Sequence, residues 1–290
     1  MKLKVNFFRF CMVALMAIVC TMCTTDEGVS PSDDTAISGR GLISGGTGTT
    51  VNLIGLSTVN ELVFMTVSHS AVETGVMPIT GLRPGESIIA IDKTKDLYGL
   101  SNQSTVYKIS PLNGVARPLG PAFAPALSGA LFGFDVSPTD NVIRVMTSGQ
   151  NLRISSTNGQ VVGQDAAWHV ATLAVNSIAY LPAVSGGKAT LYAIDIAAQK
   201  VYKQAPAGTG PVSLVGSTGF EWSAEGGFDI APNGVGYAVQ FGHGTNPEGP
   251  GVGSSGDLKE DNFRLHSVNL KTGVATSLGV VRPMVGITVK

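Results

Sequence analysis

Residues 132–163, FGFDVSPTDNVIRVMTSGQNLRISSTNGQVVG, decide the fold, because they hold four short strand patterns joined by short polar turns. The first pattern ends near Asp135, and the last two flank Asn158-Gly159, which is a strong signal for a β-hairpin. This stretch therefore predicts a small antiparallel sheet of four strands.

The same unit recurs along the chain, which points to a repeat architecture. The copy that precedes it, SIIAIDKTKDLYGLSNQSTVYKISPLNGVARPLG, carries Asn113-Gly114 at the equivalent turn. Its segment VYKI, residues 106–109, alternates in polarity with the period of a strand. Only one short helix is expected, around Asp165–Leu173, so the sequence predicts an all-β chain. The copy with Asn113-Gly114 occupies residues 87–120, a third copy occupies residues 176–216, and a fourth occupies residues 226–242 and resumes after an insertion at residues 263–279.

The two ends of the repeat region complete one more unit. Residues 51–82 match the second, third and fourth strands of a unit that lacks its first strand. The missing strand is supplied by MVGITVK at residues 284–290. We therefore predict a five-bladed β-propeller-like domain in which the C-terminal strand closes the first blade and removes the free sheet edges. A β-sandwich or an open solenoid would not explain this match between the two ends.

Composition excludes several classes of protein. With 43% hydrophobic and 13% charged residues, the body of the chain is not disordered. The chain has 19 Lys+Arg against 20 Asp+Glu, so it lacks the basic excess of a nucleic-acid-binding protein. The 37 glycines show no three-residue period, which excludes a collagen.

Residues 1–23 have the pattern of an export signal, with Lys2, Lys4 and Arg9 before an apolar run that is too short to span a membrane. Residues 24–50 are polar and read as a flexible tether, and residues 51–290 form the propeller domain. Loss of the signal would remove three positive charges and no negative ones, which leaves an acidic body.

All three cysteines, Cys11, Cys20 and Cys23, lie in the export signal, so the body can form no disulfide and holds no thiol nucleophile. Cys23, followed by an acidic tract, resembles the lipid-modified cysteine of bacterial lipoproteins, although Met22 is larger than the residue usual before it. We therefore expect a lipid-anchored protein of the bacterial cell envelope, in the periplasm or on the outer-membrane surface. The alternative is an ordinary signal peptide and a secreted protein.

The central repeat also carries a family resemblance. Residues 121–163, PAFAPALSGALFGFDVSPTDNVIRVMTSGQNLRISSTNGQVVG, resemble the signature of the bacterial family called domain of unknown function 4394. The segments LYGL at 97–100, TLYAID at 190–195 and GGFDIAP at 226–232 support it, whereas Asn141-Val142 and residues 204–208 depart from it. The resemblance implies a propeller-like fold and an uncharacterised activity.

The sequence contains none of the common catalytic motifs. It has no Gly-x-Ser-x-Gly, no His-Glu-x-x-His, no phosphate loop and no EF-hand loop. The four histidines show no metal-ligand spacing, so we expect ordinary surface or strand residues and no metal site. These histidines are His69, His169, His243 and His266.

Three aspartates end the first strands of their units: Asp92, Asp135 and Asp229. One interpretation places their carboxylates near the central axis, where they bind a cation. The interpretation that we favour is structural, with each carboxylate accepting N–H groups of the turn that follows it. The Gly-rich insertion at residues 242–262 is expected to be a solvated loop.

Arg144 and Arg153 are the candidate ligand-binding residues. If Met146 pairs with Asn151, the two arginines lie opposite each other on one face, where like charges repel. A negative group is therefore expected beside them. It is either an internal Asp, which we favour, or a bound carboxylate or phosphate, for which Gln150 and Asn151 would add neutral donors. The candidates for the internal Asp are Asp135, Asp140 and Asp165.

The leading functional hypothesis is a non-catalytic binding or scaffold module that works without a cofactor. Its partner would be a protein or a small anionic ligand. No nucleic acid is expected, the membrane is contacted only through the lipid anchor, and the protein is expected to be a monomer. The alternative is a propeller-type enzyme, a hydrolase or a quinone-dependent oxidoreductase, with its site at the mouth of the channel.

Overall fold

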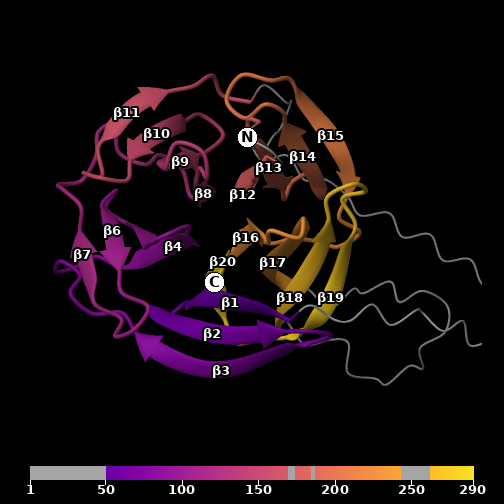
Figure 1. Ribbon diagram of the computed structural model, residues 1–290, viewed down its shortest axis with the longest axis horizontal. Helices are drawn as coiled ribbons and strands as arrows, with labels where there is room; N and C mark the ends of the chain where they lie inside the picture. The colour runs from indigo at the N-terminus through magenta and orange to yellow at the C-terminus, as the bar shows by residue number, and fades with distance from the viewer. Residues whose placement is uncertain (1–49, 169–173, 184–186, 243–261) are drawn as a thin grey trace, which may run out of the picture. The chain divides into compact units, whose positions relative to one another are not determined.

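The computed structural model describes residues 50–168, 174–183, 187–242 and 262–290. In these ranges 20 strands form five antiparallel sheets of four strands each. All of them belong to one unit, Gly46–Lys290. The sheets are arranged as a ring around a central axis, which confirms the predicted five-bladed β-propeller (Figure 1).

The blades are numbered in chain order, and the strands of each are given from the axis outward. Blade 1 contains β20 (Met284–Val289), β1 (Val51–Ser57), β2 (Glu61–Val67) and β3 (Ala71–Pro78). Blade 2 contains β4 (Ile88–Lys93), β5 (Leu97–Ser101), β6 (Val106–Ile109) and β7 (Ala116–Pro118). Blade 3 contains β8 (Gly133–Val136), β9 (Val142–Met146), β10 (Asn151–Ser155) and β11 (Val161–Gln164). Blade 4 contains β12 (Val175–Leu181), β13 (Thr190–Asp195), β14 (Lys200–Gln204) and β15 (Val212–Ser217). Blade 5 contains β16 (Gly226–Ile230), β17 (Val235–Gly242), β18 (Asn262–Asn269) and β19 (Ala275–Val280).

The C-terminal strand closes the ring, as the sequence predicts. β20 pairs antiparallel with β1, with Leu53 opposite Val289 and Gly55 opposite Ile287. Figure 1 shows the C-terminus near the centre of the ring, beside the first strands of the other blades. Because β20 comes last and β1 first, blade 1 is complete only when both ends of the domain are in place.

The hydrophobic core is divided into five clusters, each between two neighbouring blades. Between blades 1 and 2, for example, Ile54 and Leu62 pack in one cluster with Ile91 and Tyr107. Blades 5 and 1 meet in a cluster of the same kind. The inner and middle strands are therefore buried on both faces, as in β5, whereas the outer strands such as β3 are largely exposed.

Glycines act at two kinds of position. Gly114 and Gly159 adopt φ of 70° and 69° in the turns between the third and fourth strands, where the sequence predicts hairpins. On the inner strands, glycine permits close approach of the backbones, since a Cβ on Gly227 would lie 2.7 Å from the Cα of Gly286. The inner strands converge on the axis, and the space between them is narrow.

The expected short helix is not found in the described residues, and several other predictions concern residues that the structure does not describe. Residues 165–168 form no helix, and residues 169–173 of the expected helix lie outside the described residues. The same holds for residues 1–49, which carry the expected signal and tether, and for 243–261 of the insertion. In the described part of the chain, no helix has the length and apolar character needed to cross a membrane.

Candidate functional site

The candidate site lies on the axis of the propeller, where the inner strands leave two cavities. One cavity, of about 190 Å³, is lined by residues from the beginnings of the inner strands, including Ala90, Phe134 and Gly227. The other, of about 260 Å³, is lined by residues at the ends of the same strands, including Asp92, Tyr180 and Lys290. The axis is therefore hollowed at both ends of the inner strands.

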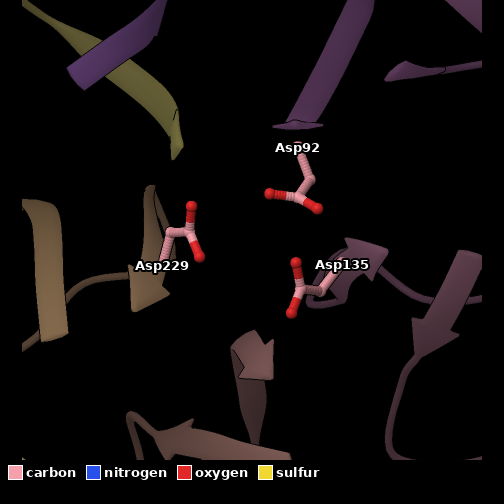
Figure 2. Close-up of side chains that lie close together, drawn as sticks. All are labelled: Asp92, Asp135 and Asp229. Atoms are coloured by element: carbon pink, nitrogen blue, oxygen red, sulfur yellow. The ribbon is translucent and has the colours of Figure 1, made fainter. Parts of the chain in front are cut away.

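Three carboxyl groups converge at the second cavity. Asp92 ends β4, Asp135 lies on β8 and Asp229 lies on β16, and Figure 2 shows their side chains pointing toward one another. They are only 3%, 4% and 7% exposed, and one oxygen of each lies within 4.8 Å of the others. We call Asp92, Asp135 and Asp229 the axial carboxyl cluster. By distance alone it could hold one divalent cation or share protons.

Each of the six carboxyl oxygens has a hydrogen-bonding group within reach. Val136 N donates to Asp92 Oδ2 and to Asp135 Oδ1, both at 2.9 Å. Tyr180 N donates to Asp135 Oδ2. For Asp229, Ile230 N donates to Oδ1 at 2.6 Å and Val289 N donates to Oδ2 at 2.6 Å.

The hydroxyl of Thr288 on β20 completes the set. Its Oγ1 lies 2.9 Å from Asp92 Oδ1 and 3.0 Å from Asp229 Oδ2, and it accepts the N–H of Lys93 at 2.9 Å. A hydroxyl carries a single hydrogen, so it can donate to only one of the two carboxyls. The second contact is a hydrogen bond only when that carboxyl is protonated and donates to the hydroxyl.

The pKa directions agree with proton sharing. Burial, with the charges of Asp92 and Asp229 beside it, holds the pKa of Asp135 well above its ordinary value. Burial and the charge of Asp92 raise the pKa of Asp229 from 3.8 to about 8. The cluster therefore retains protons at neutral pH.

The hydrogen bonds correct the expectation made for these aspartates. The following turn contributes little, because the only local donors are the N–H groups of Val136 and Ile230, each one residue further on. The other backbone donors come from neighbouring blades: Val136 on blade 3, Tyr180 on blade 4 and Val289 on blade 1. The side chains point to the axis, and there the nearest donors are the N–H groups of the next inner strand.

Sequence reasoning missed Thr288. It occupies the place of the aspartate in blade 1, because MVGITVK aligns with IIAIDK so that Thr288 falls on Asp92. The same alignment places Ala179 at the equivalent position of blade 4, where no side-chain oxygen is available. The alignment of the repeats carried the signal for both residues.

Arg144 and Arg153 do lie opposite each other, as expected from the pairing of Met146 with Asn151, which the structure contains. Asp165 lies between them: its Oδ2 is 2.8 Å from Arg144 Nη2 and its Oδ1 is 3.1 Å from Arg153 Nε. The Arg153 contact is an ion pair without hydrogen-bond geometry. One internal carboxylate therefore serves both guanidinium groups.

The remaining donors of Arg144 are also used inside the protein. Nε donates to Tyr180 Oη at 2.6 Å, and Nη1 donates to Asn151 Oδ1. Asn151 Nδ2 donates to Ala166 O, while the amide of Gln150 bonds the loop at Ala126 and Ser128. Ligand binding by Arg144, Gln150, Asn151 and Arg153 stays a prediction, and of these four only Arg153 has a substantially exposed side chain, at 42%.

Two of the four histidines lie in the described residues. His69 is exposed next to a turn, and His266 is a buried residue of β18 whose Nε2 lies 3.2 Å from Gln240 Nε2. Burial, together with the charge of Arg264, lowers the pKa of His266 to about 4, so its ring is neutral at pH 7. His169 and His243 lie outside the described residues.

Fold and site together define a five-bladed β-propeller whose axis is capped by shared carboxyl groups. The family model of a domain of unknown function, DUF4394, matches residues 61–288, and the chain belongs to this family. No curated protein matches the chain at a significant level.

Solved structures with a similar chain path include proteins of different kinds. A protein of unknown function from Bacteroides caccae is 12% identical, with 83% of this chain and 99% of that chain covered and a TM-score of 0.42. A catalytically inactive virginiamycin B lyase from Staphylococcus aureus with quinupristin is 11% identical, with 81% and 71% covered and a TM-score of 0.41. An engineered GH43 glycoside hydrolase is 12% identical, with 82% and 52% covered and a TM-score of 0.47. At this level of similarity no activity transfers to this chain.

Proposed function

We propose that the protein is a non-catalytic binding module of the bacterial cell envelope, presented on a rigid propeller. One observation carries the proposal. The axial carboxyl cluster is the one group of at least three convergent metal-ligating side chains among the described residues, and all of its oxygens are engaged by the backbone or by Thr288. A cluster that is buried and retains protons at neutral pH is a poor general base, because a general base must be deprotonated and within reach of the substrate proton.

A second candidate function rests on the same residues. A carboxyl group with a pKa of about 8, beside a cavity of about 260 Å³, is a feature of many active sites, where an acid must remain protonated at neutral pH. This feature favours a hydrolase with its site at the channel mouth as the alternative to a binding module.

One comparison separates the two functions. The wild type, Asp229→Asn and the exposed control Asp140→Asn are assayed with chromogenic esters and glycosides and with a quinone and an artificial electron acceptor. In parallel, a thermal-shift screen covers sugars, peptides and anions. The binding module predicts stabilising ligands and no turnover that depends on Asp229. Turnover that is lost in Asp229→Asn and kept in Asp140→Asn would establish the enzyme instead.

Placement in the envelope depends on Cys23, which lies outside the described residues. A thioether-linked lipid on Cys23 supplies the membrane affinity in this proposal, so Cys23→Ser should move the protein from the membrane fraction to the soluble fraction. Fractionation followed by immunoblotting measures this, with Cys20→Ser as the control that stays in the membrane. A variant Cys23→Ser that remains in the membrane fraction would contradict the lipoprotein assignment.

A further inference from the structure

Blade 2 carries a groove away from the axis that is larger than either axial cavity. Its volume is about 480 Å³, and it is formed by the turn after β4, the end of β6 and the strand β7. This volume lies within the range of about 300–1,000 Å³ that is typical of small-molecule sites. The groove has the size of a ligand site, whereas the axial cavities are smaller.

The groove is strongly positive although the body of the protein is acidic. Four cationic residues, Lys93, Lys95, Lys108 and Arg117, line it together with a single carboxylate, Asp96. Asp96 Oδ2 lies 2.8 Å from Lys108 Nζ. One carboxylate cannot balance four cations, so the lining keeps an excess of positive charge.

Lys108 and Arg117 form a cross-strand pair of like charges. They are direct partners in the register of β6 and β7, a position where like charges are destabilising. The side chain of Lys108 pairs with Asp96, whereas the guanidinium of Arg117 makes no hydrogen bond or ion pair with any residue of the described ranges. The Arg144–Arg153 pair has the same cross-strand arrangement and is balanced by Asp165, whereas no carboxylate in the described part of the chain pairs with Arg117. An external anion would supply the missing charge.

The lining also has apolar and neutral polar parts. Val115, Pro118 and Leu119 contribute apolar surface between the charged residues. Ser110 and Asn113 lie at the β6–β7 turn, and the side-chain Nδ2 of Asn113 donates to no described residue, which leaves it available to a ligand. The groove thus combines a guanidinium that favours forked contacts to oxyanions with a surface that covers a hydrocarbon.

We infer that the blade 2 groove binds an organic anion, an apolar body that carries one carboxylate or phosphate group. The anionic group lies between Arg117 and Lys95, and the apolar body covers Val115 and Pro118. This inference rests on the proposed binding role and gives it a site and a ligand class.

Calorimetric titration of the wild-type protein at low salt tests the inference. The probes are octanoate, octyl phosphate and the neutral octyl glucoside, which share the apolar chain and differ in the head group. We expect one-to-one binding of at least one of the two anions and no binding of octyl glucoside. The stronger of the two anions identifies the head group as carboxylate or phosphate.

Arg117→Gln should weaken anion binding by about tenfold or more, because a charge-assisted forked contact is lost. Its matched control is Lys271→Gln, an exposed cation at the equivalent turn of blade 5, which should bind the anions as the wild type does. Both sites are on the surface, and unchanged melting temperatures verify the fold.

The inference is overturned if neither anion binds, if Arg117→Gln binds as tightly as the wild type, or if octyl glucoside binds equally well. The failure of the proposed function is a different result. If a ligand from the thermal-shift screen binds Arg117→Gln as tightly as the wild type, the blade 2 groove is not its binding site, but the protein is still a binding module. Turnover that depends on Asp229 would contradict the non-catalytic function, whether or not the groove binds an anion.

Discussion

Arg144 carries its charge almost wholly inside the fold, at 4% exposure, and this is tolerated because all three of its nitrogens have partners. Burial of a charge is costly unless it is paired and hydrogen-bonded. The axial carboxyl cluster avoids part of this cost in another way, because it retains protons and so carries less buried charge. At the scale of single residues, the protein keeps polar groups inside by satisfying each of them.

Replacement of Arg144 by Met should therefore destabilise the propeller by about 3 kcal/mol, because Tyr180 and Asn151 lose their partner while Asp165 keeps only Arg153. Urea unfolding followed by fluorescence measures the change. Arg153→Gln is the control and should cost well under half as much, since its side chain is 42% exposed. If Arg144→Met unfolds like the wild type but loses stabilisation by phosphate or carboxylate ligands, the arginine pair binds an external anion.

Asp229 predicts a dependence of stability on pH. Its pKa of about 8 in the folded state lies above the ordinary 3.8, so the folded protein binds more protons than the unfolded chain between these values. The stabilisation is full below about pH 4 and is lost as pH rises toward about 8, by roughly 1.4 kcal/mol for each unit. Asp229→Asn cannot titrate, so its unfolding free energy should fall less over this range.

The two proteins are compared by the slope of the unfolding free energy against pH. Their absolute stabilities are not compared, because Asn also replaces one acceptor oxygen by a donor. Chemical unfolding of the wild type and of Asp229→Asn is measured at several pH values from 4 to 8. Parallel curves would show that Asp229 does not hold a proton in the folded state. The same samples with added calcium test the cation alternative, which requires a melting temperature that rises in the wild type only.

At the scale of elements, each inner strand is a sheet edge that faces the axis, and its N–H groups need acceptors. The side-chain oxygens of the neighbouring blade supply them: Asp92 accepts from Val136, Asp135 from Tyr180, and Thr288 from Lys93. The axial residues therefore join inner strands that do not pair as sheets. In blade 4 the equivalent residue is Ala179, which has no side-chain oxygen to accept the N–H of Ile230 on blade 5. Ile230 N instead donates to the carboxyl of the preceding residue, Asp229.

Thr288→Val, which keeps the shape of the side chain, should destabilise the domain by about 1–3 kcal/mol because it leaves buried polar groups without a partner. Thr276→Val on the exposed outer strand β19 is the matched control and should change stability by less than about 0.5 kcal/mol. Thermal and urea unfolding give both values. Equal stability of the two variants would mean that the axial bonds contribute little to joining the blades.

At the scale of the whole molecule, closure of the ring joins the two ends of the domain. The cluster between blades 5 and 1 contains Leu53 and Val63 from the start of the domain and Met284 and Ile287 from its end. The stability of the propeller is therefore cooperative between segments that are distant in sequence. This dependence also explains why blade 1 cannot form from a contiguous segment.

Deletion of residues 284–290 removes β20, exposes the edge of β1 and opens the last interface. We expect aggregation, or loss of the single cooperative unfolding transition, because an exposed edge strand recruits other chains. Size-exclusion chromatography and calorimetry measure these outcomes. A chain that lacks only Lys290 is the control. A monomer with an unchanged transition after the full deletion would contradict the role of β20 in closing the ring.

The blades could be predicted from the sequence because each is a local unit. Short turns such as Asn158-Gly159 join strands that are neighbours in the chain, so their pairing follows from turn residues and alternation. The pairing of Arg144 with Arg153 is also local and follows from the sequence, which offers Asp165 as one of three candidates for the internal carboxylate. Closure was the one long-range feature that could be predicted, because a repeat with a missing strand shows where the missing strand must come from.

The axial site and the blade 2 groove were decided by the tertiary structure. Asp92, Asp135 and Asp229 lie on three different blades, and only the convergence of the inner strands brings their oxygens within 4.8 Å. The pKa values of Asp135 and Asp229 are raised by burial and by the neighbouring carboxyl groups, and no local sequence pattern contains this information. The groove depends likewise on which side chains share one face of blade 2, where no carboxylate of residues 50–168 pairs with Arg117. Strand pairing is set by neighbours in sequence, whereas the charge state of a buried group is set by all the atoms that the fold places around it.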